Sequence, residues 1–166
     1  MHVLRAALLA GGIAAISSVP AFGQGAPAAK VDASVRRIFG AGAHVAVRTV
    51  GADSVLRVSR ADSLLGFAVV RNVTGKDQPI TFLVAVDSGN VLKDVDVLVY
   101  RESYGGEVAY DAWRRQFRGK SASDPLQVGR DIRTISGATI SVNAVTLGVR
   151  RALADLTTWH TSGAIR

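Results

Sequence analysis

The sequence predicts an α+β fold: a single domain in which an antiparallel sheet meander has a C-terminal helix packed on it. Three segments rich in β-branched residues follow one another between residues 65 and 100, and turn-forming residues separate them. After residue 141, apolar residues recur at helical spacing. A chain of 166 residues is long enough to bury one hydrophobic core, so we expect one folded domain.

The N-terminal segment predicts export. Arg5 precedes an apolar run over residues 6–16, and the small residues at 21 and 23 suit cleavage by a signal peptidase. The run is shorter than the roughly 20 residues that a membrane span needs. We therefore expect residues 1–23 to be a signal peptide and the protein to be periplasmic or otherwise extracytoplasmic. If the segment is retained, it would instead anchor the protein to a membrane.

The region 24–62 predicts a short helix and a strand. Residues 30–40 place Val31, Val35, Ile38 and Phe39 near one helical face, and residues 44–50 alternate as a strand does. The segment 54–65 is compatible with more than one element. We treat 24–62 as an N-terminal region that precedes the main domain.

The region 63–158 holds the predicted sheet and the long helix. Strands are expected at 65–73, 79–86 and 91–100, with a turn at 87–90. Asp94 and Asp96 alternate with apolar residues in the last strand, which predicts that they are exposed rather than a catalytic pair of carboxylates.

A glycine-rich loop and two helices complete the domain. Gly105 and Gly106 lie in the loop 101–108, where a backbone without side chains can approach a ligand closely. Residues 109–120 predict a short helix with an apolar stripe of Tyr110, Trp113 and Phe117, which favours a core role for the last two over ligand contact. The helix that follows begins, by its spacing, at about residue 141.

Composition excludes several classes of site. The chain has no cysteine, which rules out disulfides, iron–sulfur clusters and c-type haem attachment, and its three scattered histidines predict no metal site. The net charge of +7 indicates attraction to an acidic partner or an anionic cofactor, or simply a solvated basic surface. No nucleic-acid-binding motif is present, so we expect no nucleic-acid partner.

Small residues precede the long helix in the segment "ISGATIS", residues 135–141. The start of a helix attracts anions, and phosphate above all, because its first N–H groups are free and its dipole end is positive. Alternatively, Ser136, Thr139 or Ser141 caps the helix. A hydrolase nucleophile is disfavoured, since no nucleophile elbow is present and no histidine is near in sequence.

The segment "ISGATIS" resembles the flavin-attachment motif of the FMN-binding domain family, which includes the flavin-carrying subunits of sodium-translocating NADH:quinone reductase and Rnf-type complexes. Similarity extends over residues 65–156 and includes the strand–turn–strand, the loop "ESYGGE" and the segment "WRRQFRGK". The resemblance implies that Thr139 carries FMN through a phosphoester bond, which a separate flavin transferase makes. Residues 63–158 would then be the FMN-binding domain.

The same resemblance suggests further residues of the cofactor site. Those expected to surround the phosphate and the flavin are Ser136, Gly137, Ala138, Glu102, Tyr104, Gly105, Gly106, Lys120 and Arg133. Glu102 would contact the flavin or order its own loop, and Tyr104 would stack on the ring. No catalytic residue and no metal ligand is predicted.

The expected function is that of an exported flavoprotein that relays electrons to or from a membrane or periplasmic redox partner. The FMN supplies the redox chemistry, and the protein attaches and orients it. Many relatives have an acidic residue at the position of Arg133. That difference supports the alternative, a non-covalent FMN-binding or sensory module without electron-transfer activity.

Overall fold

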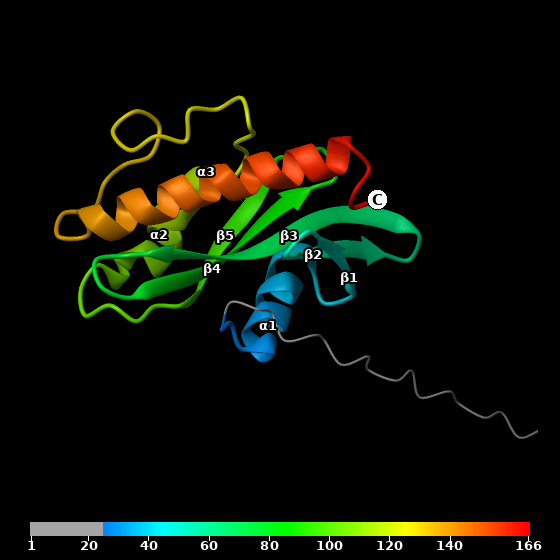
Figure 1. Cartoon of the computed structure of the whole chain (residues 1–166), viewed down its shortest axis with the longest axis horizontal. Helices are drawn as coiled ribbons and strands as arrows, with labels where there is room; N and C mark the ends of the chain where they lie inside the picture. The colour runs from blue at the N-terminus through cyan, green and yellow to red at the C-terminus, as the bar shows by residue number, and fades with distance from the viewer. Residues whose placement is uncertain (1–24) are drawn as a thin grey trace, which may run out of the picture.

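A computed structural model describes residues 25–166, so the predicted signal peptide lies outside the described residues. The elements are one helix, five strands and a helical segment, followed by a long C-terminal helix (Figure 1). Their bounds are α1 Ala28–Phe39, β1 His44–Val50, β2 Asp53–Arg60, β3 Ser63–Thr74, β4 Pro79–Asp87, β5 Leu92–Val99, η1 Gly106–Ala109, α2 Asp111–Arg114, η2 Arg115–Phe117 and α3 Thr139–Thr161. Within residues 25–166, no helix has the length and apolar character that a membrane crossing requires.

The five strands form one antiparallel sheet in the order β1-β2-β3-β4-β5, so the predicted meander is confirmed and extends two strands further toward the N-terminus. The ambiguous segment 54–65 supplies β2 and the start of β3. Gly66 lies beside a register shift in the β2–β3 pair and has a φ of +149°. A Cβ there would lie 2.0 Å from the Val86 carbonyl oxygen on β4, so the strands can approach this closely only because residue 66 is glycine.

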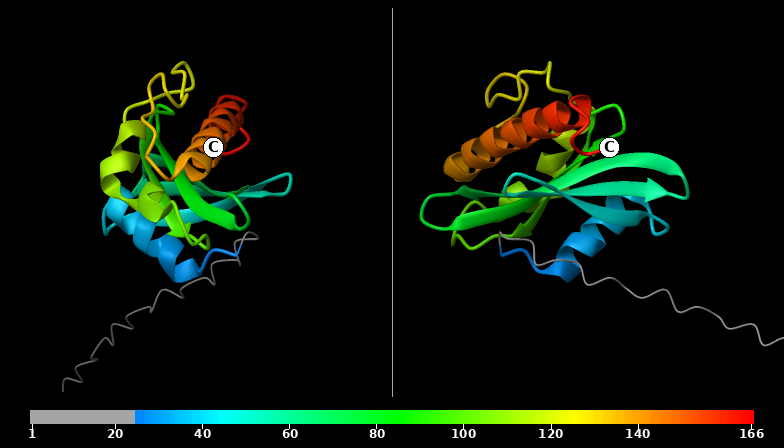
Figure 2. Two further views of the ribbon diagram at one scale, coloured as in Figure 1. Left: turned by 90° about the vertical axis from the view of Figure 1, so that its left-hand side faces the viewer. Right: turned by 45° about the vertical axis from the view of Figure 1, so that its right-hand side comes forward.

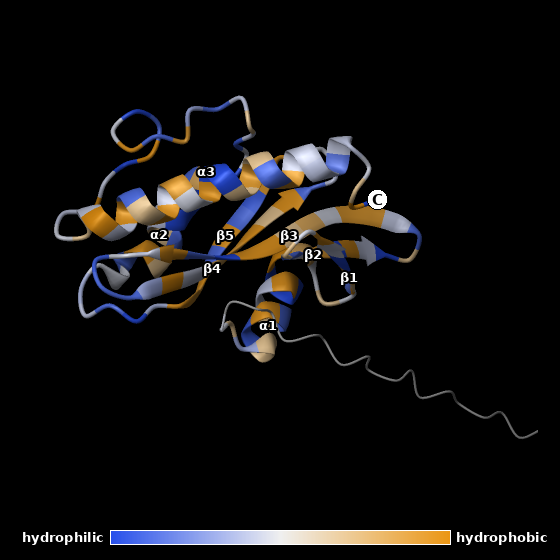
Figure 3. Cartoon of the chain, viewed as in Figure 1, coloured by the Kyte–Doolittle hydropathy of each residue, from blue (hydrophilic) through white to orange (hydrophobic). Residues whose placement is uncertain are grey.

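The long helix α3 covers one face of the sheet (Figure 1). Its apolar positions, including Val142, Val145, Val149 and Leu153, are fully buried against β3 and β4, and Figure 3 shows apolar residues recurring along the helix. At Gly148 an added Cβ would lie 2.6 Å from both Val73 and Phe82 side chains. The helix is therefore packed as close to the sheet as a residue without a side chain permits, which confirms the predicted packing of the C-terminal helix.

Helix α1 covers the opposite face, so the molecule has three layers with the sheet in the middle (Figure 2). Val31, Val35 and Phe39 are buried there against apolar side chains of β2 to β5. The sequence predicted the amphipathic pattern of this helix but not the face it would cover. No break in the sheet marks the predicted boundary at residue 62, because β2 pairs with β3 along most of its length.

The segment after β5 folds along the edge of that strand. It was predicted as one helix over 109–120, but it consists of three short pieces: η1, α2 and η2. Trp113 and Phe117 are buried and pack edge to face, whereas Tyr110 is 65% exposed, so only part of the predicted stripe is core. Hydrogen bonds from Leu92 N–H to the Lys120 carbonyl and from Gly119 N–H to the Leu92 carbonyl, both 2.8 Å, close one end of this edge.

The prediction that Asp94 and Asp96 are exposed was wrong. Asp94 is 3% exposed, and its carboxylate accepts hydrogen bonds from Arg37 on α1 (2.7 Å) and from Arg118 after η2 (3.2 Å). Asp96 pairs with Arg37 as well and accepts a bond from Ser34 on α1. The alternation along β5 could not predict that arginines from α1 and from the segment after η2 would cover this face of the sheet.

Candidate functional site

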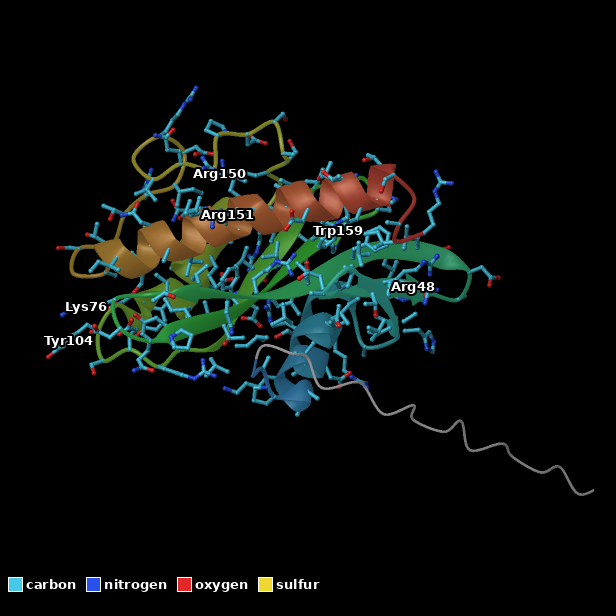
Figure 4. The ribbon with its side chains drawn as sticks, in the orientation of Figure 1. Arg48, Lys76, Tyr104, Arg150, Arg151 and Trp159 are labelled. Carbon is cyan, nitrogen blue, oxygen red and sulfur yellow. The ribbon has the colours of Figure 1, made fainter. Side chains whose placement is uncertain are left out.

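A cavity of about 390 Å³ opens where α3 begins. Three segments that are far apart in the sequence meet there: the turn between β3 and β4, the loop after β5, and the residues at the start of α3. A volume of this size lies within the range of small-molecule sites. Figure 4 shows Lys76 and Tyr104 at this end of the molecule. The lining residues are Lys76, Asp77, Glu102, Ser103, Tyr104, Gly137, Ala138, Thr139, Ile140 and Ser141.

Thr139 is the first residue of α3, two residues before the predicted start. Its side chain is exposed, and within residues 25–166 no hydrogen bond engages its hydroxyl. The residue before the helix is Ala138, and no side chain caps the first turn, so the predicted cap by Ser136, Thr139 or Ser141 was wrong. The first helical bond runs from the Val142 N–H to the Ala138 carbonyl, 2.9 Å, which leaves the earlier amides open to an anion.

Gly137 and Ala138 shape the turn that places Thr139 at the cavity. Gly137 has a φ of +81°, a conformation that glycine adopts without strain, and the space where a side chain would stand is open. Ala138 is buried in the core below α3, and its N–H bonds to the Ile135 carbonyl at 3.0 Å. Ala138 therefore anchors the turn, whereas Gly137 and Thr139 on either side of it are exposed to solvent.

The glycine-rich loop of residues 101–108, called the glycine loop below, packs directly against the start of α3. The Tyr100 hydroxyl lies 2.8 Å from the Ser141 hydroxyl and also donates to the Tyr104 carbonyl. Gly105 lies between them with a φ of +87°, and a Cβ there would stand 2.8 Å from each of the two hydroxyl oxygens. The predicted close approach at Gly105 is thus to the protein itself. Gly106 lies beside the Tyr100 ring.

Glu102 holds two walls of the cavity together. Its carboxylate accepts hydrogen bonds from the backbone N–H groups of Asp77 (2.7 Å) and Gln78 (3.0 Å), in the turn between β3 and β4. The bonds from Gln78 and Asp77 lower the pKa of Glu102, so the carboxylate stays ionised. Of the two roles considered for Glu102, this geometry favours the ordering of a loop.

Besides the two glycines of the loop, three other predicted residues lie outside the cavity lining. Ser136 is exposed in the preceding turn. Lys120 pairs with Asp131 at 3.0 Å. Arg133 lines a neighbouring hollow of about 550 Å³. The Trp113 indole N–H holds the Arg133 carbonyl at 2.8 Å. Contact of these three residues with a cofactor stays a prediction.

Sequence reasoning missed Lys76, Asp77, Ser103, Tyr100 and the bond that Ser141 makes. The turn signal in residues 75–78 was visible between two strands. The sequence did not indicate that this turn would lie beside the glycine loop, because that depends on the register of β3, β4 and β5.

The arrangement suits a phosphorylated ligand. Open helix amides would bind the phosphate, and the exposed Thr139 hydroxyl lies beside them. Tyr104 is 86% exposed and offers a ring to a planar group. The residues present therefore fit FMN, whose phosphate and ring need these two kinds of partner.

Comparison with known proteins agrees with this geometry. Residues 75–154 match the model of the FMN-binding domain. The chain is also similar to one of the subunits of the proton-translocating ferredoxin:NAD(+) oxidoreductase complex of Clostridium ljungdahlii, with 31% identity over 108 residues, which are 60% of this chain and 58% of that relative. The chain thus spans less than two thirds of the length of the curated relative it matches.

Proposed function

Since residues 75–154 form an FMN-binding domain with FMN as its cofactor, we propose that the chain is an exported electron-transfer flavoprotein with FMN attached through a phosphoester to Thr139. The observation that carries the attachment is the Thr139 hydroxyl, which is exposed and unpartnered within the described residues at the uncapped start of α3. Similarity to a component of a redox complex supports electron transfer with a membrane partner.

The protein's own part is to hold and orient the cofactor. FMN supplies the redox chemistry when it is bound. The helix amides and the positive end of the α3 dipole stabilise a phosphate at Thr139. Ala138 in the core and the Tyr100–Ser141 bond fix the attachment residue relative to the glycine loop. No unfolding is needed for attachment, because Thr139 is already exposed, so we propose that a separate flavin transferase modifies the folded protein.

Intact mass of the denatured protein tests the attachment. The chain is produced together with a flavin transferase, and a gain equal to FMN minus water is expected on the peptide that contains Thr139. Thr139→Ala should abolish the gain, whereas Thr49→Ala, which removes an exposed threonine hydroxyl on β1 outside the cavity lining, should keep it. Full covalent flavin in Thr139→Ala would refute the assignment. Flavin that is released on denaturation of the wild type would support the non-covalent alternative.

Export is proposed from the N-terminal segment alone. Expression with the full leader in a Gram-negative host should yield, in the periplasmic fraction, a protein whose N-terminus follows residue 23. A full-length chain in the membrane fraction would favour the retained anchor, and a full-length chain in the cytoplasm would refute export.

A further inference from the structure

Lys76 carries the only positive side chain among the described residues that line the cavity at Thr139. It stands in the turn between β3 and β4, which the Glu102 carboxylate joins to the loop that carries Tyr104. The lysine is exposed, and Figure 4 shows it at the same end of the molecule as Tyr104. An ammonium group at this wall interacts electrostatically with any charged group that is bound in the cavity.

The turn that bears Lys76 is fixed at this wall. The Glu102 carboxylate accepts the N–H groups of the two residues after Lys76, at 2.7 and 3.0 Å. The backbone is so close to the carboxylate that a Cβ on Gly75 would lie 2.5 Å from the Glu102 Oε1 atom. Glu102 therefore holds the backbone that follows Lys76 and lies close to the residue that precedes it.

We propose that Lys76 is the cation that tunes the reduction potential of the bound FMN, and that Glu102 is the positioning residue that holds Lys76 at the cavity. This inference rests on the proposed function. Two-electron reduction of a flavin with uptake of one proton from water adds one negative charge. A nearby ammonium group stabilises that charge, so Lys76 makes the reduced cofactor more stable and raises its reduction potential.

The positive charge of Lys76 sets the sign of the effect, and the other charged side chains of the lining are acidic. Asp77 and Glu102 are the acidic residues of the lining, and Glu102 is already engaged with the turn. Loss of the lysine charge leaves only these carboxylates and the helix amides. The ratio of affinities for the reduced and oxidised cofactor should then fall about tenfold, which lowers the potential of a two-electron couple by about 30 mV.

The experiment is a reductive titration of the FMN-loaded protein with dithionite as electron donor and reference dyes. Wild type is compared with Lys76→Met and with the matched control Lys93→Met. Lys93 is an exposed lysine on β5 that lies over the Phe39 ring on the α1 side of the sheet. We expect the potential to fall in Lys76→Met and to stay within a few millivolts of wild type in Lys93→Met. Equal potentials in all three proteins, or equal falls in both variants, would overturn the proposal.

A double-mutant cycle tests the part of Glu102. If Glu102 positions the lysine, Lys76→Met should change the potential less than half as much in a Glu102→Ala background as in wild type. An equal change in both backgrounds would refute the positioning role. A wild-type protein that holds no flavin, covalent or free, would refute the proposed function and this inference with it. A flavin-bearing wild type whose potential ignores Lys76 would refute this inference alone.

Discussion

Replacement of Gly105 by alanine should separate the glycine loop from the start of α3. Residue 105 has a φ of +87°, where an alanine costs about 1–2 kcal/mol. The new Cβ would also lie 2.8 Å from the hydroxyl oxygens of Tyr100 and Ser141, which are themselves bonded at 2.8 Å. Displacing one hydroxyl forfeits that hydrogen bond, about 1 kcal/mol more. The variant should therefore lose about 2–3 kcal/mol of unfolding free energy.

The matched control is Gly119→Ala. Gly119 has a φ of +79°, but no atom stands within 4 Å of the position that its Cβ would take. It should show the backbone cost alone. In urea unfolding followed by tryptophan fluorescence, both variants should keep the wild-type slope, and Gly105→Ala should unfold at the lower urea concentration. The reasoning is refuted if Gly105→Ala is as stable as Gly119→Ala.

Two further predictions concern the sheet. Asp94→Asn removes a buried charge partner of Arg37 and should cost about 3 kcal/mol in denaturant unfolding. Burial alone would raise the pKa of Asp94, but hydrogen bonds from Arg37 and Arg118 outweigh it and lower the pKa below its ordinary 3.8. The wild type should thus lose this stability as the pH falls below about 4, and Asp94→Asn should lose less over that range; parallel curves would contradict this. Gly66→Ala should destabilise by more than 3 kcal/mol, because its Cβ meets a backbone oxygen, and a melting temperature near wild type would contradict the close approach.

Local pattern predicted the elements well and their contacts poorly. The antiparallel meander, the α1 helix and the buried face of α3 follow from periodicity and turn residues, which act over short distances in sequence. The segment 109–120 is not one helix, because Tyr110 and Arg118 have extended backbones with ψ of 137° and 135°. Between them, the Arg114 side chain donates to the Val95 carbonyl of β5. That contact depends on tertiary structure.

In the candidate site, too, the residues of a local motif were predicted and the contacts between distant segments were not. Thr139, Gly137 and Glu102 were identified from a motif, and the structure places all three at one cavity. Lys76 was missed, because nothing in a turn sequence tells which loop it will meet. Lys120 pairs with Asp131, a partner that the sequence did not indicate, and its contact with a cofactor stays a prediction. A cation can be assigned to a site only when the fold shows that it lines that site.

The order in which these segments join has a consequence for the folding kinetics. Neighbouring strands of the meander are joined by short turns, so their contacts close small loops and are expected to form early. The cavity instead brings residues 75–78 beside 137–141, which requires α3 to dock across the finished sheet. We therefore expect the site to assemble in the last step of folding. Cofactor bound within this cavity would then report that the whole domain has reached its native state, which makes flavin content a direct assay of folding yield.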